Sequence, residues 1–243
     1  MEYPQIRITG DTSAAVVFGD EISEEINAAI RTFDKLLNER QLDGVYETVP
    51  TYCALTVHYA PEIVRYHELE KALWELLAET GSAEKANPVV IEIPVLYGGD
   101  YGPDLNYVAQ YNHMTTEEVI RIHSGAEYLI YMLGFTPGFS YMGGMDARIE
   151  TPRLKTPRVL IPAGSVGIAG KQTGIYPIDS PGGWQLIGRT PVRLYDAERD
   201  TPILLDAGMK VKFVPVNEEE YLRIKSRVEE GRYRCHTYVG EER

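Results

Sequence analysis

The glycine and proline content of residues 134–188 constrains the fold more than any other feature of this chain. These 55 residues contain 11 of the chain's 22 glycines and 6 of its 15 prolines. Glycine is costly inside regular elements and occurs where the backbone takes positive φ or approaches another group closely. Proline fixes φ and removes a hydrogen-bond donor. The segment also carries aromatic side chains, which low-complexity linkers lack: Phe135, Phe139, Tyr141, Tyr176 and Trp184. We therefore expect tightly turned β structure around a functional site.

The bulk composition is typical of an ordinary globular protein. The 243 residues suffice for one large domain or two smaller ones, and 44% are hydrophobic and 25% charged. No apolar run approaches the roughly 18 residues that span a bilayer, and the N-terminus lacks the pattern of a signal peptide. The two cysteines, Cys53 and Cys235, are far apart in the sequence. We therefore expect a reduced, cytoplasmic protein without disulfides, a metal site or membrane contact.

The charge of the chain is unevenly distributed. A net charge of −12 argues against general nucleic-acid binding. Residues 146–195 nevertheless carry a net +4, which leaves −16 for the remainder. The seven basic side chains of this span, here called the basic island, are Arg148, Arg153, Lys155, Arg158, Lys171, Arg189 and Arg193. Such an island suits a carboxylate, phosphate or carbamate ligand. The alternative is a set of surface arginines that acids elsewhere neutralise.

The first part of the chain alternates strand and helix patterns. We expect helices from Asp20 or Ser23 and over residues 67–80, the second ended by Gly81. The expected strands cover residues 14–18, 45–49, 52–59 and 89–96. The resulting order, β-α-β-β-α-β, is that of a ferredoxin-like α/β sandwich. Residues 80–88 are the only linker candidate, so we place the domains at 1–86 and 87–243.

The second part of the chain predicts a closed or nearly closed β-barrel. Two short helices come first, one at 105–111 capped by Asp104 and one at 117–123, where Thr115 and Glu118 form a capping box. Regularly spaced short strands are then typical of a barrel, and they cover residues 128–133, 159–161, 165–168, 174–178, 185–187, 192–195, 203–205 and 211–216. A charged helix at 218–230, capped by Asn217, ends the pattern.

Motifs for covalent or nucleotide chemistry are absent from the sequence. The segment GSVGIAGKQT (164–173) fails the Walker pattern at Ser165 and at Gln172, and its glycines better fit barrel corners. Ser140 and Ser165 lie near nucleophile-elbow patterns, but no helical pattern follows either serine. The five histidines have no metal-ligand spacing.

A few polar side chains remain as candidates for chemistry. His123 ends a helix just before the barrel, where it suits either general acid–base work or electrostatic capping. Arg153 and Arg189 have the side chain best suited to bidentate carboxylate recognition. Tyr176 and Trp184 either wall a small pocket or pack in the barrel.

Several long motifs closely resemble the KipI/PxpB family, also called allophanate hydrolase subunit 1, which is similar to subdomains C and D of the urea carboxylase carboxyltransferase unit. They are YGGDYGPDLNYVA (97–109), LGFTPGFSYMGG (133–144), TPR (151–153) and IPAGSVGIAGKQTGIYPIDSPGGWQLIGRTP (161–191), together with the start of the chain (1–23). The resemblance covers essentially the whole chain except the tail after Val216. It implies a smaller α+β domain followed by a cyclophilin-like β-barrel.

The resemblance also implies an activity and partners. The family works with a KipA/PxpC-type subunit and usually a PxpA-type (LamB/YcsF) protein, in a complex that hydrolyses 5-oxoproline to glutamate and uses ATP. We expect His123, Arg153 and Arg189 to be catalytic in that complex. The expected substrate-binding residues are Phe139, Gln172, Thr173, Tyr176 and Trp184. The alternatives are a KipI-type inhibitor of a sensor histidine kinase and a biotin-dependent component that acts on urea or a similar amide.

Overall fold

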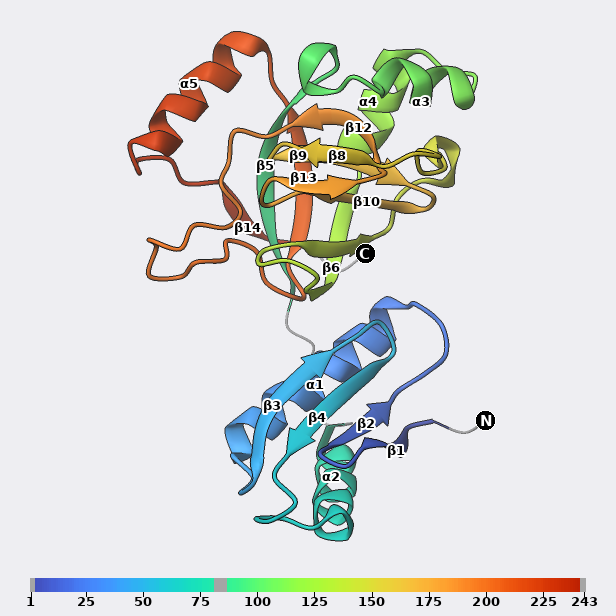
Figure 1. Cartoon of the computed structure of the whole chain (residues 1–243), viewed down its shortest axis with the longest axis vertical. Coiled ribbons are helices and arrows are strands. Elements are labelled where there is room, and N and C mark those ends of the chain that lie inside the picture. The colour runs from blue at the N-terminus through green and yellow to red at the C-terminus, as the bar shows by residue number, and fades with distance from the viewer. Residues whose placement is uncertain (1–2, 81–86, 241–243) are drawn as a thin grey trace. The chain divides into compact units, whose positions relative to one another are not determined.

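The computed structural model describes residues 3–80 and 87–240 (Figure 1). Internal contacts divide the chain into two compact units, Met1–Ala86 and Asn87–Arg243. Most of the polar stretch in which we place the domain boundary, including Gly81, lies outside the described residues.

The first unit packs two helices against an antiparallel sheet. Its elements are β1 (Gln5–Gly10), β2 (Ser13–Val17), α1 (Glu24–Arg40), β3 (Val45–Pro50), β4 (Ala54–Tyr59) and α2 (Tyr66–Thr80). The strands lie in the order β1-β2-β4-β3. Apolar side chains at helical spacing on α1, such as Ile30 and Phe33, meet the alternate residues Leu55 and Val57 of β4 and Leu73 of α2 in one buried cluster. Ser23 caps α1 by accepting a hydrogen bond from the Ile26 amide.

The expected ferredoxin-like order is not found, because its last strand belongs elsewhere. Residues 89–96 form most of β5 (Val89–Tyr97), which lies in the second unit and pairs with strands of its sheet. The fourth strand of the first unit is instead β1, which precedes β2 and pairs with it at the sheet edge. Its alternation is weak, since four of its six residues are exposed, and the sequence patterns do not predict it.

The second unit contains a nearly closed, barrel-like sheet. Its strands run in the order β10-β9-β12-β5-β13-β6-β7, and β14 pairs with β5. β10 and β7 end the path close together, since a Cβ added to Gly174 would lie 3.6 Å from the Ser140 carbonyl oxygen. The strands after β5 are β6 (Glu127–Leu133), β7 (Ser140–Gly143), β8 (Arg158–Ile161), β9 (Ser165–Ala169), β10 (Gln172–Ile175), β11 (Ser180–Gly182), β12 (Gln185–Arg189), β13 (Lys210–Pro215) and β14 (Thr237–Val239).

Two predicted strands are wrong, and the remaining barrel strands are found with shifted ends. Residues 192–195 and 203–205 form only a single bridge, between Tyr195 and Ile203. The segment GSVGIAGKQT folds as the β9–β10 hairpin, with Gly164 and Gly170 in its turns at positive φ. β8 and β11 pair with each other as a separate two-stranded ribbon.

The helices of the second unit follow local capping signals. They are η1 (Gly99–Tyr101), α3 (Leu105–Tyr111), α4 (Thr116–Ser124), η2 (Ala147–Ile149) and α5 (Glu218–Glu229). Thr115 and Glu118 form the expected capping box of α4, and Asn217 caps α5. Asp104 precedes α3 but makes no capping bond, because its side chain bonds elsewhere.

The YGGDYG segment crosses β12 so closely that glycine is required at its end. The Gly98 amide donates to the Ile187 carbonyl (3.0 Å) and the Asp104 amide to the Leu186 carbonyl (2.9 Å). A Cβ added to Gly102 would overlap the Ile187 carbonyl oxygen. Both groups are backbone, so neither has a side chain that can move away.

We predict that Gly102→Ala destabilises the second unit by about 2 kcal/mol or more, because the overlap forces the backbone of β12 to shift. Gly183→Ala is the matched control, since its added Cβ meets nothing closer than 3.7 Å. We expect it to change the free energy of unfolding by about 0.5 kcal/mol or less. Urea denaturation in a Trp74→Phe background, where Trp184 is the only tryptophan, measures both. Equal stability of the two variants would contradict the close approach.

Candidate functional site

Aromatic side chains from the glycine-rich block form one cluster on the sheet of the second unit. This aromatic cluster consists of Phe139, Tyr176 and Trp184, with Tyr141 packed at its margin, and Ile161, Ala169 and Leu186 complete it. The Phe139 ring meets Trp184 at 5.9 Å and Tyr176 at 6.0 Å, edge to face. Glycine makes room for the indole, because a Cβ on Gly174 would lie 3.2 Å from Trp184. The rings are largely buried in the isolated chain, so they are packed before any ligand binds.

Arg153 places a cation against this cluster. Its guanidinium lies 6.0 Å from the centre of the Trp184 ring, and the side chain is exposed. Burial raises the pKa of Tyr176, while Arg153 and then Arg158 oppose that rise. An exposed guanidinium held by an indole beside a phenol has the donors and the charge to bind a carboxylate.

Arg158 is neutralised, by a residue that the sequence does not suggest as a partner. Its guanidinium donates to a carboxylate oxygen of Asp104 (2.7 Å) and to the Trp184 carbonyl (3.2 Å). The other oxygen of Asp104 accepts the Leu186 amide at 2.6 Å. This ion pair is mostly buried and ties the end of the YGGDYGPD segment to β12 and β8. No local signal predicts it, since the two residues are 54 positions apart.

The structure sorts the basic island into paired and unpaired cations. Arg148 pairs with Asp146 and Arg193 with Asp196, as Arg158 does with Asp104. Within residues 3–80 and 87–240, no carboxylate lies within 4.0 Å of the four other cations, which are Arg153, Lys155, Lys171 and Arg189. The alternative of neutralised surface arginines thus describes only part of the island.

Arg189 lies in a different environment from Arg153. It ends β12, whereas Trp184 precedes the same strand. Its guanidinium is 5.9 Å from the Tyr101 ring and affects the pKa of Tyr221 on α5. Its Nε is buried and has no hydrogen-bond partner in the described part of the chain. The ring contacts therefore bring Arg153, but not Arg189, to the aromatic cluster.

His123 is fully buried and held at both ring nitrogens. Nε2 lies 2.8 Å from the Thr173 hydroxyl, and Nδ1 lies 2.8 Å from the Tyr97 hydroxyl. Thr173 gives its one hydroxyl proton to the Gly167 carbonyl (3.1 Å), so Nε2 must be the donor and Nδ1 the acceptor. The imidazole also stacks on Phe213, with 4.5 Å between ring centres. Thr173 is buried as well, so the structure places both residues beneath the surface rather than on it.

Burial makes His123 a neutral side chain. It lowers the pKa of the imidazole to about 3. A helix C-terminus favours the imidazolium, but here desolvation outweighs that effect. Burial also raises the pKa of Tyr97 well above its usual range, so this pair is uncharged.

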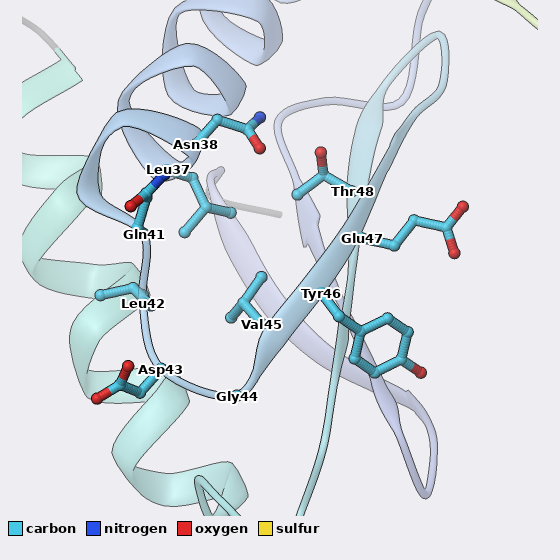
Figure 2. A pocket seen from close by; sticks show the side chains of 10 residues that line it. All are labelled: Leu37, Asn38, Gln41, Leu42, Asp43, Gly44, Val45, Tyr46, Glu47 and Thr48. Carbon is cyan, nitrogen blue, oxygen red and sulfur yellow. The ribbon is translucent and has the colours of Figure 1, made fainter.

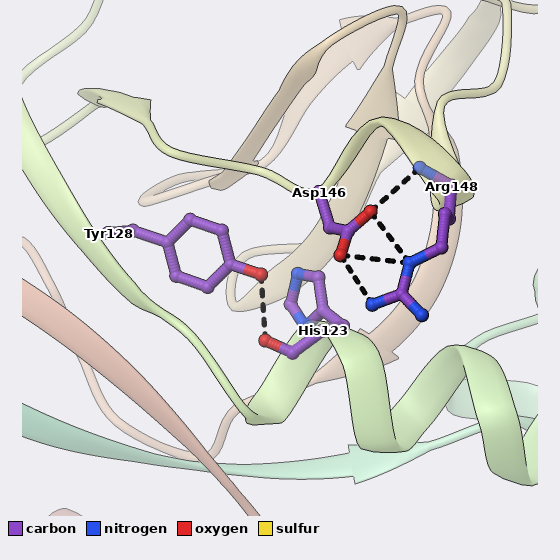
Figure 3. A network of polar contacts seen from close by, with 4 residues as sticks. All are labelled: His123, Tyr128, Asp146 and Arg148. Carbon is purple, nitrogen blue, oxygen red and sulfur yellow. Dashed lines mark hydrogen bonds and ion pairs between the residues drawn. The ribbon is translucent and has the colours of Figure 1, made fainter.

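A second set of polar contacts surrounds the same residue (Figure 3). The Tyr128 hydroxyl donates to the His123 carbonyl at 2.7 Å, which fixes the end of α4 against β6. The Arg148 guanidinium beside Asp146 lowers the pKa of that carboxyl to about 2. The figure shows this ion pair facing the histidine, but its hydrogen bonds remain within the pair.

The other candidate residues lie on the same sheet without a shared contact to Arg153. Gln172 begins β10 and is half-buried. Ser140 and Ser165 are fully buried, and neither Oγ has a hydrogen-bond partner in the described part of the chain. A buried hydroxyl is not accessible as a nucleophile to a substrate in solution.

A surface hollow of about 450 Å³ occurs in the first unit (Figure 2). It is lined by the end of α1, the following turn and the edge strand β3, and none of the candidate residues contributes to it. Among residues 3–80 and 87–240 there is no group of three or more His, Cys, Asp and Glu side chains that could hold a metal ion. No helix in that part of the chain is long and apolar enough to cross a membrane.

The family model of the carboxyltransferase domain, subdomain C and D, matches residues 4–205. The chain belongs to this family. The match includes Arg153, Arg189 and the whole aromatic cluster, while α5, which contributes Tyr221 near Arg189, lies beyond it.

Members of this carboxyltransferase-domain family that resemble the chain include named subunits of 5-oxoprolinase. The chain is 45% identical over 227 residues to the 5-oxoprolinase subunit of this type from Bacillus subtilis, covering 89% of this chain and 95% of that one. It is 39% identical over 221 residues to the equally named subunit of Escherichia coli O157:H7, covering 90% and 99%. A urea amidolyase of Lachancea kluyveri is 32% identical over 142 residues, which are 54% of this chain and 8% of that protein.

A solved structure extends the comparison to the fold. The crystal structure of TTHA0988 is 35% identical in sequence and superposes with a TM-score of 0.75. The match covers 88% of this chain but 40% of that one. An equivalent of this carboxyltransferase-domain chain is therefore part of a longer polypeptide in that relative.

We predict that His123 makes the second unit sensitive to acid. The unfolded imidazole binds a proton near pH 6.5 and the folded one only near pH 3. The stability that neutral His123 provides is therefore present above pH 6.5 and is lost as the pH falls toward 3, by about 1.4 kcal/mol per pH unit. Between pH 7 and pH 5 this amounts to about 2 kcal/mol.

Urea denaturation at pH 7 and pH 5, followed by Trp184 fluorescence, measures this loss. His123→Gln keeps polar groups at the site but has no proton to gain, so its stability should fall by about 2 kcal/mol less than that of the parent chain. His236→Gln, at an exposed histidine, should behave like the parent. A His123→Gln chain as acid-sensitive as the parent would contradict the burial of a neutral imidazole.

Proposed function

We propose that this chain is a subunit of an ATP-dependent 5-oxoprolinase complex, which hydrolyses 5-oxo-L-proline to L-glutamate. The observation that carries the proposal is the near-complete overlap with two proteins that are named as 5-oxoprolinase subunits, of which the chain covers 95% and 99%. Matches of that extent leave little of those subunits without an equivalent here.

The chemistry of the reaction fits the unpaired cations of the site. A five-membered lactam is a stable amide, so coupling its hydrolysis to ATP supplies the driving force. Water adds to the carbonyl carbon, the C–N bond breaks, and the product carries two carboxylates and an amine. In this proposal the Arg153 guanidinium, held against Trp184, orients a carboxylate of the substrate or an anionic intermediate. Phe139, Tyr176 and Gln172 form the wall beside it.

Two further residues have indirect roles in the proposal. His123 and Thr173 are buried, so they position the β9–β10 hairpin through the Gly167 carbonyl rather than meet the substrate. Arg189 acts at the opposite end of β12, near Tyr101, on a second anionic group.

The proposed complex also contains partners. A relative that is named as one subunit implies further subunits, and we assign these to the KipA/PxpC and PxpA (LamB/YcsF) types. ATP belongs to the complex, since the chain has no phosphate-binding loop. Mixing the purified chain with these two subunits and measuring 5-oxoproline-dependent ATP hydrolysis tests the proposal. A mixture without activity would refute it.

A urea carboxylase-type component is the second candidate, because the chain shares 32% identity with a segment of a urea amidolyase. That function needs a biotin carrier, whereas 5-oxoprolinase activity does not. Urea-dependent, avidin-sensitive ATP hydrolysis would select the second candidate over the first.

We predict that Arg153→Ala lowers kcat/KM for 5-oxoproline in the reconstituted complex about tenfold or more, because a charge-assisted contact to an anion is lost. Arg153→Lys should recover little, since lysine lacks the planar fork. Arg193→Ala is the control, at an exposed arginine of the same island that already pairs with Asp196. Equal kinetics for Arg153→Ala and Arg193→Ala would rule out the assigned role of Arg153.

A further inference from the structure

Phe135 is held in a position that its own chain does not reward. The loop between β6 and β7 presents this side chain with 78% of its surface exposed. Its backbone lies in the left-handed region, with φ +67°, where a bulky residue is strained. In the described part of the chain its ring meets one other ring, that of Phe139, at 6.0 Å. An exposed aromatic ring on a strained backbone points to a function outside the isolated chain.

Two more apolar side chains are exposed next to the same cluster. On β8, Val159 is 91% exposed and Leu160 is 60% exposed, and the next residue, Ile161, is buried in the aromatic cluster together with Phe139. Phe135, Val159 and Leu160 thus adjoin one buried group of side chains from two directions. We call these three residues the docking patch. Exposed apolar groups gathered in this way mark interaction surfaces.

Unpaired cations flank the docking patch. Residues 151–154 run beside Trp184, because the Leu154 amide donates to the Gly183 carbonyl and the Gly170 amide to the Thr151 carbonyl, each at 2.7 Å. These bonds place Arg153, Lys155 and Lys171 around the indole, and within the described residues no carboxylate pairs with them. A protein that covers the patch therefore needs an apolar pocket for Phe135 and an acidic rim around it.

We propose that the docking patch is where the KipA/PxpC-type subunit binds, with Phe135 as the anchor of the contact. This inference rests on the proposed function. A permanent neighbour is further supported by TTHA0988, in which the match to this chain takes up 40% of a longer chain. Phe139 links Phe135 to Trp184, and Trp184 carries Arg153. The partner therefore encloses Arg153, and the substrate site is complete only in the complex.

Phe135→Gly separates binding from folding. Glycine accepts positive φ without strain, so the isolated chain should keep or raise its melting temperature. The dissociation constant for the purified KipA/PxpC-type subunit, measured by isothermal titration calorimetry, should rise about tenfold or more, as for the loss of an interface anchor. At saturating partner, 5-oxoproline-dependent ATP hydrolysis should approach that of the parent complex. Tyr107→Ala, at an aromatic residue of the same unit that is 47% exposed, should leave the dissociation constant within about twofold.

The outcomes distinguish this inference from the function on which it rests. A parent chain that does not bind the partner overturns both. Binding by the parent with an unchanged dissociation constant for Phe135→Gly overturns the docking patch and leaves the function standing. A lower melting temperature of Phe135→Gly would show that the loop serves its own fold, which also overturns the inference. If Phe135→Gly binds the partner normally but loses binding to the dimerisation helices of a sensor histidine kinase, the assigned occupant is wrong.

Discussion

The close approach of neighbouring backbone to strand β12 is the constraint on which the second unit depends. The YGGDYG segment crosses one side of the strand, and Gly102 has no room for a side chain there. β5 and β9 pair with its two edges. Trp184 and Arg189 lie at opposite ends of this enclosed strand, so their positions are set by backbone hydrogen bonds rather than by flexible side-chain packing. The density of glycine in the sequence is therefore explained by what approaches this strand.

The second determinant of the site is which cations lack a partner. Sequence alone locates the basic island, because charge is a local count. It does not identify the pairs, because Arg158 meets Asp104 across 54 residues and the loop that carries Asp104 reaches β12 only in the folded chain. Once Arg148, Arg158 and Arg193 are neutralised, the unpaired charge that remains is concentrated near Trp184 and Tyr101. A site for anions follows from the pairing rather than from the net charge of the segment.

The accuracy of the sequence analysis follows the range of the interactions involved. The starts of α1, α4 and α5 are predictable because Ser23, the Thr115–Glu118 box and Asn217 act within one turn. Local patterns predict β5 as a strand but assign it the wrong neighbours, since its parallel partner β13 begins more than a hundred residues later. They miss strand β7, because its short, serine- and glycine-containing sequence resembles a turn and its pairing with β6 defines it. The aromatic residues are predictable as a group around a site, but whether each is buried or exposed depends on the fold.

His123 and Phe135 show why that last distinction matters for function. Both lie near the glycine-rich block, and each is a plausible site residue by type. Burial makes His123 neutral and commits its two nitrogens to Tyr97 and Thr173, so it has no free atom for a substrate. Phe135 has the opposite character, because its chain exposes it at the cost of backbone strain. A residue that gains nothing within its own fold can be retained only through a contact in a larger assembly, which is why the exposed ring indicates more about function than the buried imidazole does.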